Sequence, residues 1–271
     1  MLRTGLHRVL LAGMGALAAH GAVVNADEKV AAAQAQAPIK QFIGCPIYRD
    51  TDAGRKSGCW LVTDPADGLR YDVTPALLKP LLGRQILVEG AVSKDDPGQC
   101  GGIVLEPVSV SVLPDDCKEF LIPAEGHPGR PFVTPTSVLQ PSTVPRQLPP
   151  PPYETREYTI LFELNSDFLV YQYAEMIIEN AVLYTRASKP QYVRITGYAA
   201  TRGSNVSGRH IREDISLAEA RARMVAEAFT RLGVPSSALQ LNWEGEPSSS
   251  TAPEDGLVEA AKRRVTITIE P

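Results

Sequence analysis

Proline is unevenly distributed in this 271-residue chain, which contains 23 prolines. Nine of them fall between Pro128 and Pro152, and the last four are consecutive. Proline fixes φ and removes a backbone donor, so such a run cannot lie inside a helix or a sheet. We expect polyproline II there, at about 3.1 Å per residue. The run predicts two domains, at residues 39–127 and 153–271, joined by a proline-rich linker at 128–152.

Residues 1–26 are typical of a secretory signal peptide, with two arginines before an apolar stretch at 9–19. That stretch is too short to span a bilayer comfortably, and the alternative interpretation is a buried N-terminal helix. A cleavage point before Asp27 has no adjacent cysteine, so we expect no lipid anchor. No later segment is apolar for about 18 residues, so we expect no transmembrane span. We therefore predict a soluble mature protein in the periplasm, peripheral to the outer membrane.

All four cysteines, Cys45, Cys59, Cys100 and Cys117, belong to the first predicted domain. An even number of cysteines in a small exported domain indicates disulfides, here two. The alternative, a zinc site, needs C-x2-4-C pairs that the spacing does not offer. Three pairings are open, and the shorter loops favour Cys45–Cys59 with Cys100–Cys117. We expect no metal and no cofactor.

The first domain is rich in strand patterns separated by turns. Thr74 and Pro75 have the residue types of an N-cap and a first helical position, so a short helix is expected there. This order predicts a small disulfide-bonded β-barrel, OB-like or SH3-like. Such barrels often bind oligonucleotides or sugars, but no basic stripe with interleaved aromatics is present, so we expect no nucleic acid. The domain is interpreted as a structural module or as a contact for an envelope protein partner. The predicted strands are residues 58–63, 69–73, 84–92 and 103–113.

The second domain alternates strand and helix patterns in the order βαβαββ, which predicts an α/β sandwich with helices on one side of a sheet. Residues 165–167 are interpreted as the cap of the first helix. In the second helix, Arg221 is placed at the edge of an inward stripe formed by Leu217, Ala220, Met224 and Ala228. The predicted strands are 157–164, 191–196, 239–243 and 263–269, and the predicted helices are 168–186 and 216–232.

Several motifs of this second domain resemble those of the OmpA-like peptidoglycan-associated family, over about residues 157–271. Gly197–Gly203 is similar to the family's G-H-T-D-x-x-G, and Asp214–Ala222 to its N-x-x-L-S-x-x-R-A. Three further segments match in order: Leu161–Ser166, the turn Gly245–Pro247, and Lys262–Ile267, which resembles N-R-R-V-x-I. The first domain resembles no family that we recognise.

The resemblance implies a cell-wall ligand, the zwitterionic diaminopimelate of the peptidoglycan peptide stem. In the family an arginine grips the ligand's carboxylate and an aspartate grips its ammonium, and the arginine corresponds to Arg221. The aspartate is replaced by Ala200, and losing such a charge-assisted contact costs about 1.5–3 kcal/mol. Asp214 is a candidate replacement, and Asn165 of the opening segment is a third candidate binding residue.

The remaining sequence features argue against other functions. A formal net charge of −4 excludes a protein that binds nucleic acid through bulk positive charge. Only His127 and His210 remain after the signal peptide, and no catalytic motif is present, so we do not expect an enzyme. Two functions stay open. One is a periplasmic envelope protein that associates with peptidoglycan. The other is an interaction module of an envelope assembly, in which the OmpA-like domain no longer binds peptidoglycan.

Overall fold

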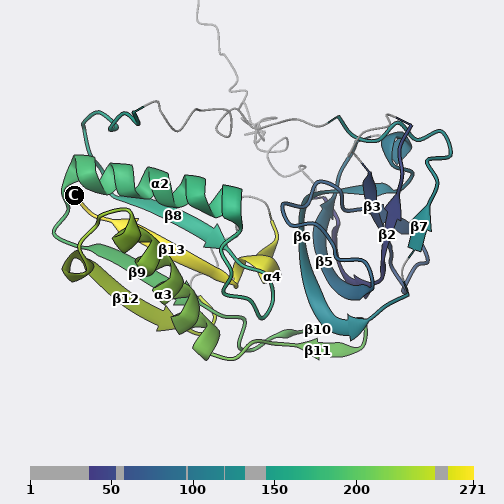
Figure 1. Cartoon of the computed structure of the whole chain (residues 1–271). Coiled ribbons are helices and arrows are strands. Elements are labelled where there is room, and N and C mark those ends of the chain that lie inside the picture. Colours follow the sequence, from purple (N-terminus) through teal and green to yellow (C-terminus); the bar gives the residue numbers. More distant parts are fainter. Residues whose placement is uncertain (1–36, 53–57, 96, 119, 132–144, 248–255) are drawn as a thin grey trace, which may run out of the picture. The chain divides into compact units, whose positions relative to one another are not determined.

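The computed structural model in Figure 1 contains a seven-stranded sheet in the region predicted as the first domain and a four-stranded sheet in the region predicted as the second, and we keep these two domain names below. The residues that the structure describes are 37–52, 58–95, 97–118, 120–131, 145–247 and 256–271. The signal peptide and residues 132–144 of the linker lie outside them, so both stay predictions.

The first domain contains a seven-stranded sheet with the order β1-β5-β6-β4-β3-β2-β7. Neighbouring strands are antiparallel, except that β4 runs parallel to β6 and β2 runs parallel to β7. The strand predicted at 84–92 is confirmed with the same bounds. The elements are β1 (Ile39–Gly44), β2 (Pro46–Arg49), β3 (Cys59–Thr63), β4 (Arg70–Asp72), β5 (Arg84–Val92), the 3-10 helix η1 (Pro97–Gln99), β6 (Ile103–Asp116) and β7 (Phe120–Ile122).

The predicted barrel is confirmed only as a disulfide-bonded, sheet-rich domain. Among the described residues the order of strands ends at β1 on one side and β7 on the other, and no closed barrel is found. The OB-like or SH3-like type therefore stays a prediction.

Strand β5 is buried on both faces because each face meets a different partner. Ile86 and Val88 belong to the core of the first domain. Leu87, which alternates with them, packs in a second cluster with Leu164 and Val206 of the second domain. The consecutive apolar residues Ile86, Leu87 and Val88 suit a strand that is covered on both sides.

Both predicted disulfides form, but the favoured pairing is wrong: Cys45 is joined to Cys117, and Cys59 to Cys100. Strand pairing across the sheet sets the partners, rather than distance along the chain. Cys45 follows the end of β1, which pairs with β5, and β5 pairs with β6, which ends beside Cys117. The two bonds close loops of 72 and 41 residues.

The short helix expected at Thr74 and Pro75 is also wrong, since residues 74–81 form turns. The Thr74 hydroxyl accepts a hydrogen bond from the Trp60 amide at 2.8 Å instead of capping a helix. Lys79 donates its ammonium to the carbonyls of Thr74 and Ala76, at 2.6 and 2.8 Å. The bond from Trp60 and the local bonds from Lys79 therefore occupy groups that a helical turn would have used.

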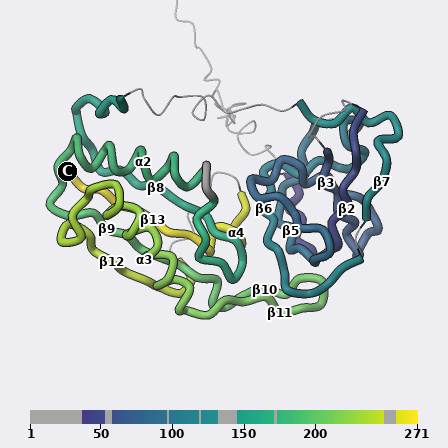
Figure 2. Tube along the Cα trace, in the orientation of Figure 1, coloured from purple at the N-terminus to yellow at the C-terminus, as the bar shows by residue number. Residues whose placement is uncertain are grey.

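The second domain is a four-stranded sheet, in the order β12-β9-β13-β8, on which α2 and α3 pack together. This arrangement confirms the predicted α/β sandwich, and Figure 2 follows its chain path. Between β9 and α3, where no strand was predicted, the chain forms a two-stranded hairpin, β10–β11. The elements are β8 (Arg156–Leu161), α2 (Tyr171–Ser188), β9 (Val193–Tyr198), β10 (Ser204–Val206), β11 (Arg209–Ile211), α3 (Ser216–Arg231), η3 (Ser236–Ala238), β12 (Leu239–Glu244), α4 (Val258–Ala261) and β13 (Arg264–Ile269).

Helix α2 begins later than predicted, with Val170 at its N-cap and no side-chain capping bond. Ser166, which the sequence suggested as part of the cap, uses its hydroxyl to accept a bond from the Phe168 amide. In α3 the predicted inward stripe is rotated by one residue. The residues of α3 that are buried are Ala218, Arg221, Ala222, Val225, Ala226 and Phe229.

Residues 37–271 cluster as one compact unit, and polar contacts join its two domains. Arg263 and Glu89 form a buried ion pair, with side chains 3% and 4% exposed. The Ser111 hydroxyl accepts a hydrogen bond from the Leu164 amide at 2.9 Å. The β10–β11 hairpin contributes as well, because Arg209 pairs with Asp115 at 2.9 Å.

The last part of the linker contacts α2 through an ion pair. Arg146 forms an ion pair with Glu179 at 2.8 Å. The Glu154 amide donates to the Tyr184 hydroxyl, which donates to the Glu154 carbonyl. No helix among the described residues is long and apolar enough to cross a membrane.

Candidate functional site

Arg221 lies at the centre of the buried face of α3 and is fully enclosed, with 0% of its side chain exposed. Gly197 in β9 allows α3 to come this close to the sheet. A Cβ at that position would stand 1.9 Å from the Ala218 carbonyl oxygen, so only glycine fits there. The close approach brings the Arg221 guanidinium beneath the loops that follow β8 and β9.

Every N–H group of the Arg221 guanidinium has an acceptor within the chain. Nε donates to the Ser166 carbonyl at 2.9 Å. Nη1 donates to the Tyr198 carbonyl and to Glu213 Oε2, both at 2.8 Å. Nη2 donates to the Glu163 carbonyl at 3.1 Å and to Glu213 Oε1 at 2.5 Å. A guanidinium has five donors, and all five are used here.

Glu213, only 4% exposed, is the carboxylate that neutralises Arg221. Its Oε1 also accepts the Asn165 amide at 2.8 Å, and its Oε2 accepts the Ala200 amide at 2.9 Å. Burial raises the pKa of Glu213, but the hydrogen bonds and charge of Arg221 outweigh burial, so the pKa is lowered overall. We call the guanidinium of Arg221 together with the amides of Asn165 and Ala200 the cradle.

The buried Arg221 links the loops after β8 and β9 to α3. All of these residues lie within the part of the chain that a family model matches. The model of the OmpA family matches residues 161–264. These residues form an OmpA-family domain.

Solved structures resemble the OmpA-family domain at low identity. One is the OmpA-like domain of FopA1 from Francisella tularensis subsp. tularensis SCHU S4, at 19% identity and a TM-score of 0.34, covering 42% of this chain and 71% of that chain. Another is the cell wall anchor of the T6SS from Pseudomonas aeruginosa, at 22% and 0.32, covering 43% and 82%. A third is the peptidoglycan-associated lipoprotein from Burkholderia pseudomallei, at 19% and 0.32, covering 42% and 90%. No curated protein matches the chain.

The three binding residues predicted for the OmpA-family domain occupy different places around the cradle. Asp214 is exposed, and its carboxylate accepts the Ser216 amide at 2.9 Å instead of facing Arg221. That bond to Ser216 lowers the pKa of Asp214. Asn165 has an exposed side chain and a φ of 55°, and it is the main-chain amide of Asn165 that enters the cradle. Peptidoglycan binding by these residues stays a prediction.

Glu213 is the residue that sequence analysis missed. Its position directly before Asp214 and eight residues before Arg221 gave no periodic pattern that would place it inside. Its burial depends on the β10–β11 hairpin, which returns the chain to the sheet, where the Glu213 amide bonds the Ala200 carbonyl at 3.0 Å. The one sequence feature that could have identified Glu213 is its acidic side chain directly before the motif that begins at Asp214.

A second acidic residue, Glu246, supports the loop that follows β9. Glu246, in the Gly245–Pro247 turn, accepts the amide of Arg202 at 2.9 Å and the amide of Gly203 at 3.3 Å. Its carboxylate also pairs with the Arg202 guanidinium at 3.1 Å and with Lys262 at 3.5 Å. Glu246 therefore supports the loop after β9 and is already neutralised by two cations.

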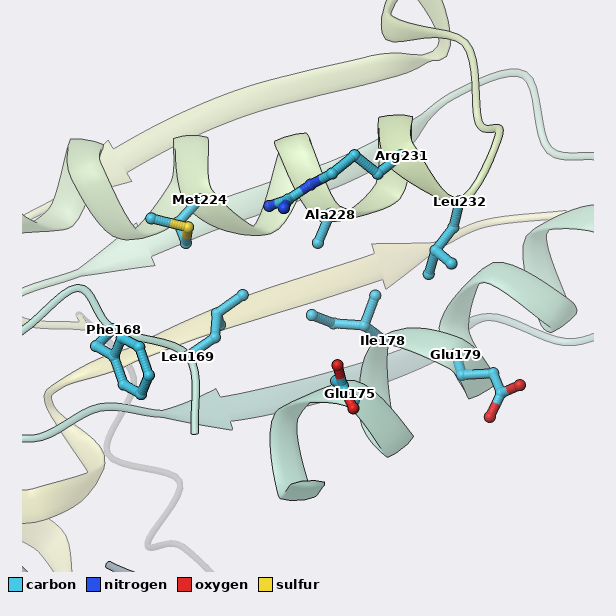
Figure 3. A pocket seen from close by; sticks show the side chains of 9 residues that line it. All are labelled: Phe168, Leu169, Glu175, Ile178, Glu179, Met224, Ala228, Arg231 and Leu232. Atoms are coloured by element: carbon cyan, nitrogen blue, oxygen red, sulfur yellow. The ribbon is translucent and has the colours of Figure 1, made fainter. Parts of the chain in front are cut away.

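A separate groove of about 560 Å³ runs between α2 and α3 (Figure 3). Its walls are largely apolar, with three charged residues among them. The residues that line the groove are Phe168, Leu169, Glu175, Ile178, Glu179, Met224, Ala228, Arg231 and Leu232.

No group of His, Cys, Asp or Glu that could hold a metal ion occurs among the described residues.

Proposed function

We propose that this protein is a non-enzymatic component of the bacterial cell envelope, and that its OmpA-family domain associates weakly with peptidoglycan. The observation that carries the proposal is the family match at residues 161–264. The motif resemblance implies that Arg221 corresponds to the family's carboxylate-binding arginine. A guanidinium suits a carboxylate because its planar fork can donate two parallel hydrogen bonds. The proposed ligand is the zwitterionic residue of the peptide stem.

The proposed association is weak for two reasons. Ala200 offers the ammonium group of the ligand no acidic side chain, and Glu246 is paired with Arg202 and Lys262. In addition, a ligand carboxylate would have to compete with Glu213 for Arg221.

One observation favours a second candidate function, an interaction module that does not bind peptidoglycan. All five donors of Arg221 have partners inside the chain, so the domain is complete without a ligand. In this alternative, the domain contributes its surface to an envelope assembly.

Cosedimentation of the mature chain with purified peptidoglycan sacculi separates the two functions. Peptidoglycan association predicts retention that free diaminopimelate reduces and that an amino acid lacking the second amine and carboxylate does not. The whole chain is required, because cutting between the domains would expose Leu164, Val206 and the buried Arg263. Absence of retention at low ionic strength would leave the interaction module as the function.

We also propose the periplasm as the location, on the outer-membrane side. The two disulfides support this proposal, because disulfides persist in oxidising compartments. Fractionation of cells that express the chain, with mass determination of the mature N-terminus, tests the location. An uncleaved chain that stays in the cytoplasm would contradict it.

For the first domain we propose an OB-like barrel that contacts an envelope protein partner. Only Cys45 separates β1 from β2, so the two can act as one bent strand. That strand pairs with β5 through β1 and with β3 through β2, while β6 pairs with both β5 and β4, and β4 pairs with β3. These pairs would form a ring. Slow hydrogen exchange of the amides on both sides of Cys45 would support the ring, and fast exchange on one side would contradict it.

A further inference from the structure

The cradle around Arg221 is assembled from donors that converge on one carboxylate. The guanidinium donates from Nη1 and Nη2 to the two oxygens of Glu213, in the fork geometry that suits a carboxylate. The amides of Asn165 and Ala200 each donate to one of the same two oxygens. Four hydrogen bonds from three separate parts of the chain therefore hold a single carboxylate group.

Glu213 reaches this cradle from a segment that otherwise faces solvent. Its neighbours Arg212, Asp214 and Ile215 are exposed, and Glu213 alone among these four is buried. The segment is a short connection between β11 and α3. The carboxylate thus enters the cradle from the surface as the end of a side chain, in the way a ligand group would.

We propose that the cradle is a carboxylate-binding site that the chain's own Glu213 occupies, and that an external carboxylate enters only when Glu213 leaves. The ligand class is a small or peptide-borne carboxylate. The part of this inference that concerns peptidoglycan rests on the proposed function, whereas occupation of the cradle by a free carboxylate does not. Glu213 would then set how strongly the domain associates with the cell wall.

Chemical rescue tests the cradle directly. In Glu213→Ala the side-chain carboxylate is removed, and Arg221 and the amides of Asn165 and Ala200 lose their acceptor. We expect acetate to raise the melting temperature of this variant more than chloride does at equal ionic strength. Wild type and Glu219→Ala should show no acetate-specific rise, because Glu219 is a half-buried α3 carboxylate outside the cradle that pairs with Arg223. Equal effects of acetate and chloride on Glu213→Ala would overturn the proposal.

Glu213→Ala can fail to fold in chloride, so refolding in acetate is measured as well. Recovery of folded protein in acetate but not in chloride supports the proposal. If Glu213→Ala refolds in neither salt, Glu213→Gln is tested instead. This variant keeps the size of the side chain but removes its charge, so it binds Arg221 less strongly. We then expect sacculus retention to rise about tenfold or more relative to wild type. Unchanged retention of folded Glu213→Gln would overturn the proposal in that case.

The two assays separate this inference from the proposed function. Acetate rescue without sacculus retention by any variant supports the self-occupied cradle and contradicts peptidoglycan association. Sacculus retention that is equal in wild type and Glu213→Ala, with no acetate rescue, overturns the self-occupied cradle and supports peptidoglycan association. Rescue together with stronger retention of Glu213→Ala supports both.

Discussion

At the scale of single residues, Glu213 supplies the carboxylate that neutralises the buried Arg221. Replacing Arg221 by alanine leaves the Glu213 carboxylate buried without its cation, and removing one partner of a buried pair costs about 3–5 kcal/mol. We expect Arg221→Ala to lower the free energy of unfolding by about that amount in urea denaturation. Arg223→Ala is the matched control, because its side chain is 61% exposed and should cost at most about 1 kcal/mol. Equal losses in the two variants would contradict the role of Arg221.

The same pair predicts how stability depends on pH. The pKa of Glu213 is lowered in the folded state, so its stabilising contribution is complete above its ordinary value of 4.5. That contribution is lost as pH falls through the lower, folded pKa. We expect the free energy of unfolding to fall more steeply in wild type than in Glu213→Gln as pH falls from 4.5 to the folded pKa, measured in urea at a series of pH values. Parallel curves would rule out Glu213 as the source.

The site was only partly predictable from sequence, for reasons visible in these residues. The family motif singled out Arg221, whose ligand role stays a prediction, and helix periodicity placed it at the edge of the buried stripe because arginine counts as polar, whereas it is fully buried. Its burial depends on acceptors from residues 163, 166, 198 and 213, which tertiary structure alone brings together. Asp214 was named as the replacement acid and Glu213 was not considered, because sequence spacing cannot tell which of two adjacent acids turns inward.

At the scale of elements, the disulfides should carry a large part of the stability of the first domain. By loop-closure entropy, loops of 72 and 41 residues correspond to about 4 kcal/mol each. We expect the double variant Cys45→Ser with Cys117→Ser to lower the free energy of unfolding by about 4 kcal/mol. Urea denaturation monitored by Trp60, which lies in β3, measures this loss. An unfolding midpoint equal to that of wild type would contradict the prediction.

Elements with strong local patterns were predicted well, and those set by distant contacts were not. Strand β5 was predicted with the right bounds, because its apolar run is long enough to identify it. The β10–β11 hairpin was missed, since its exposed polar residues resemble a loop and part of its support comes from Asp115. The disulfide pairing failed for the same reason, because it follows from contacts between distant strands. The β1–β5 and β5–β6 pairings bring Cys45 to Cys117, and the β3–β4 and β4–β6 pairings bring Cys59 to Cys100.

At the scale of the whole molecule, the buried Arg263–Glu89 pair should make the two domains unfold together. Removing Glu89 leaves Arg263 buried without a carboxylate, so we expect Glu89→Ala to cost about 3–5 kcal/mol. Trp60 and Trp243 lie in different domains and report on each, so wild type should give a single midpoint with both probes. Glu270→Ala is the control, because it removes only an exposed pair with Arg194. Two separate midpoints in wild type would contradict the coupling.

Because these contacts join the two domains, the proline-rich segment does not act as a spacer that sets the distance between them. A spacer sets the distance between bodies that move independently, but here the residues at 145–154 are fastened to α2, and the Ser111–Leu164 bond and the Arg263–Glu89 pair already join the domains. The segment then closes a loop whose ends are held by the fold. Halving such a loop changes its closure entropy by only about 0.6 kcal/mol, so its length is nearly free to vary. Its prolines act mainly on the unfolded chain, where each one reduces the number of conformations that folding must give up.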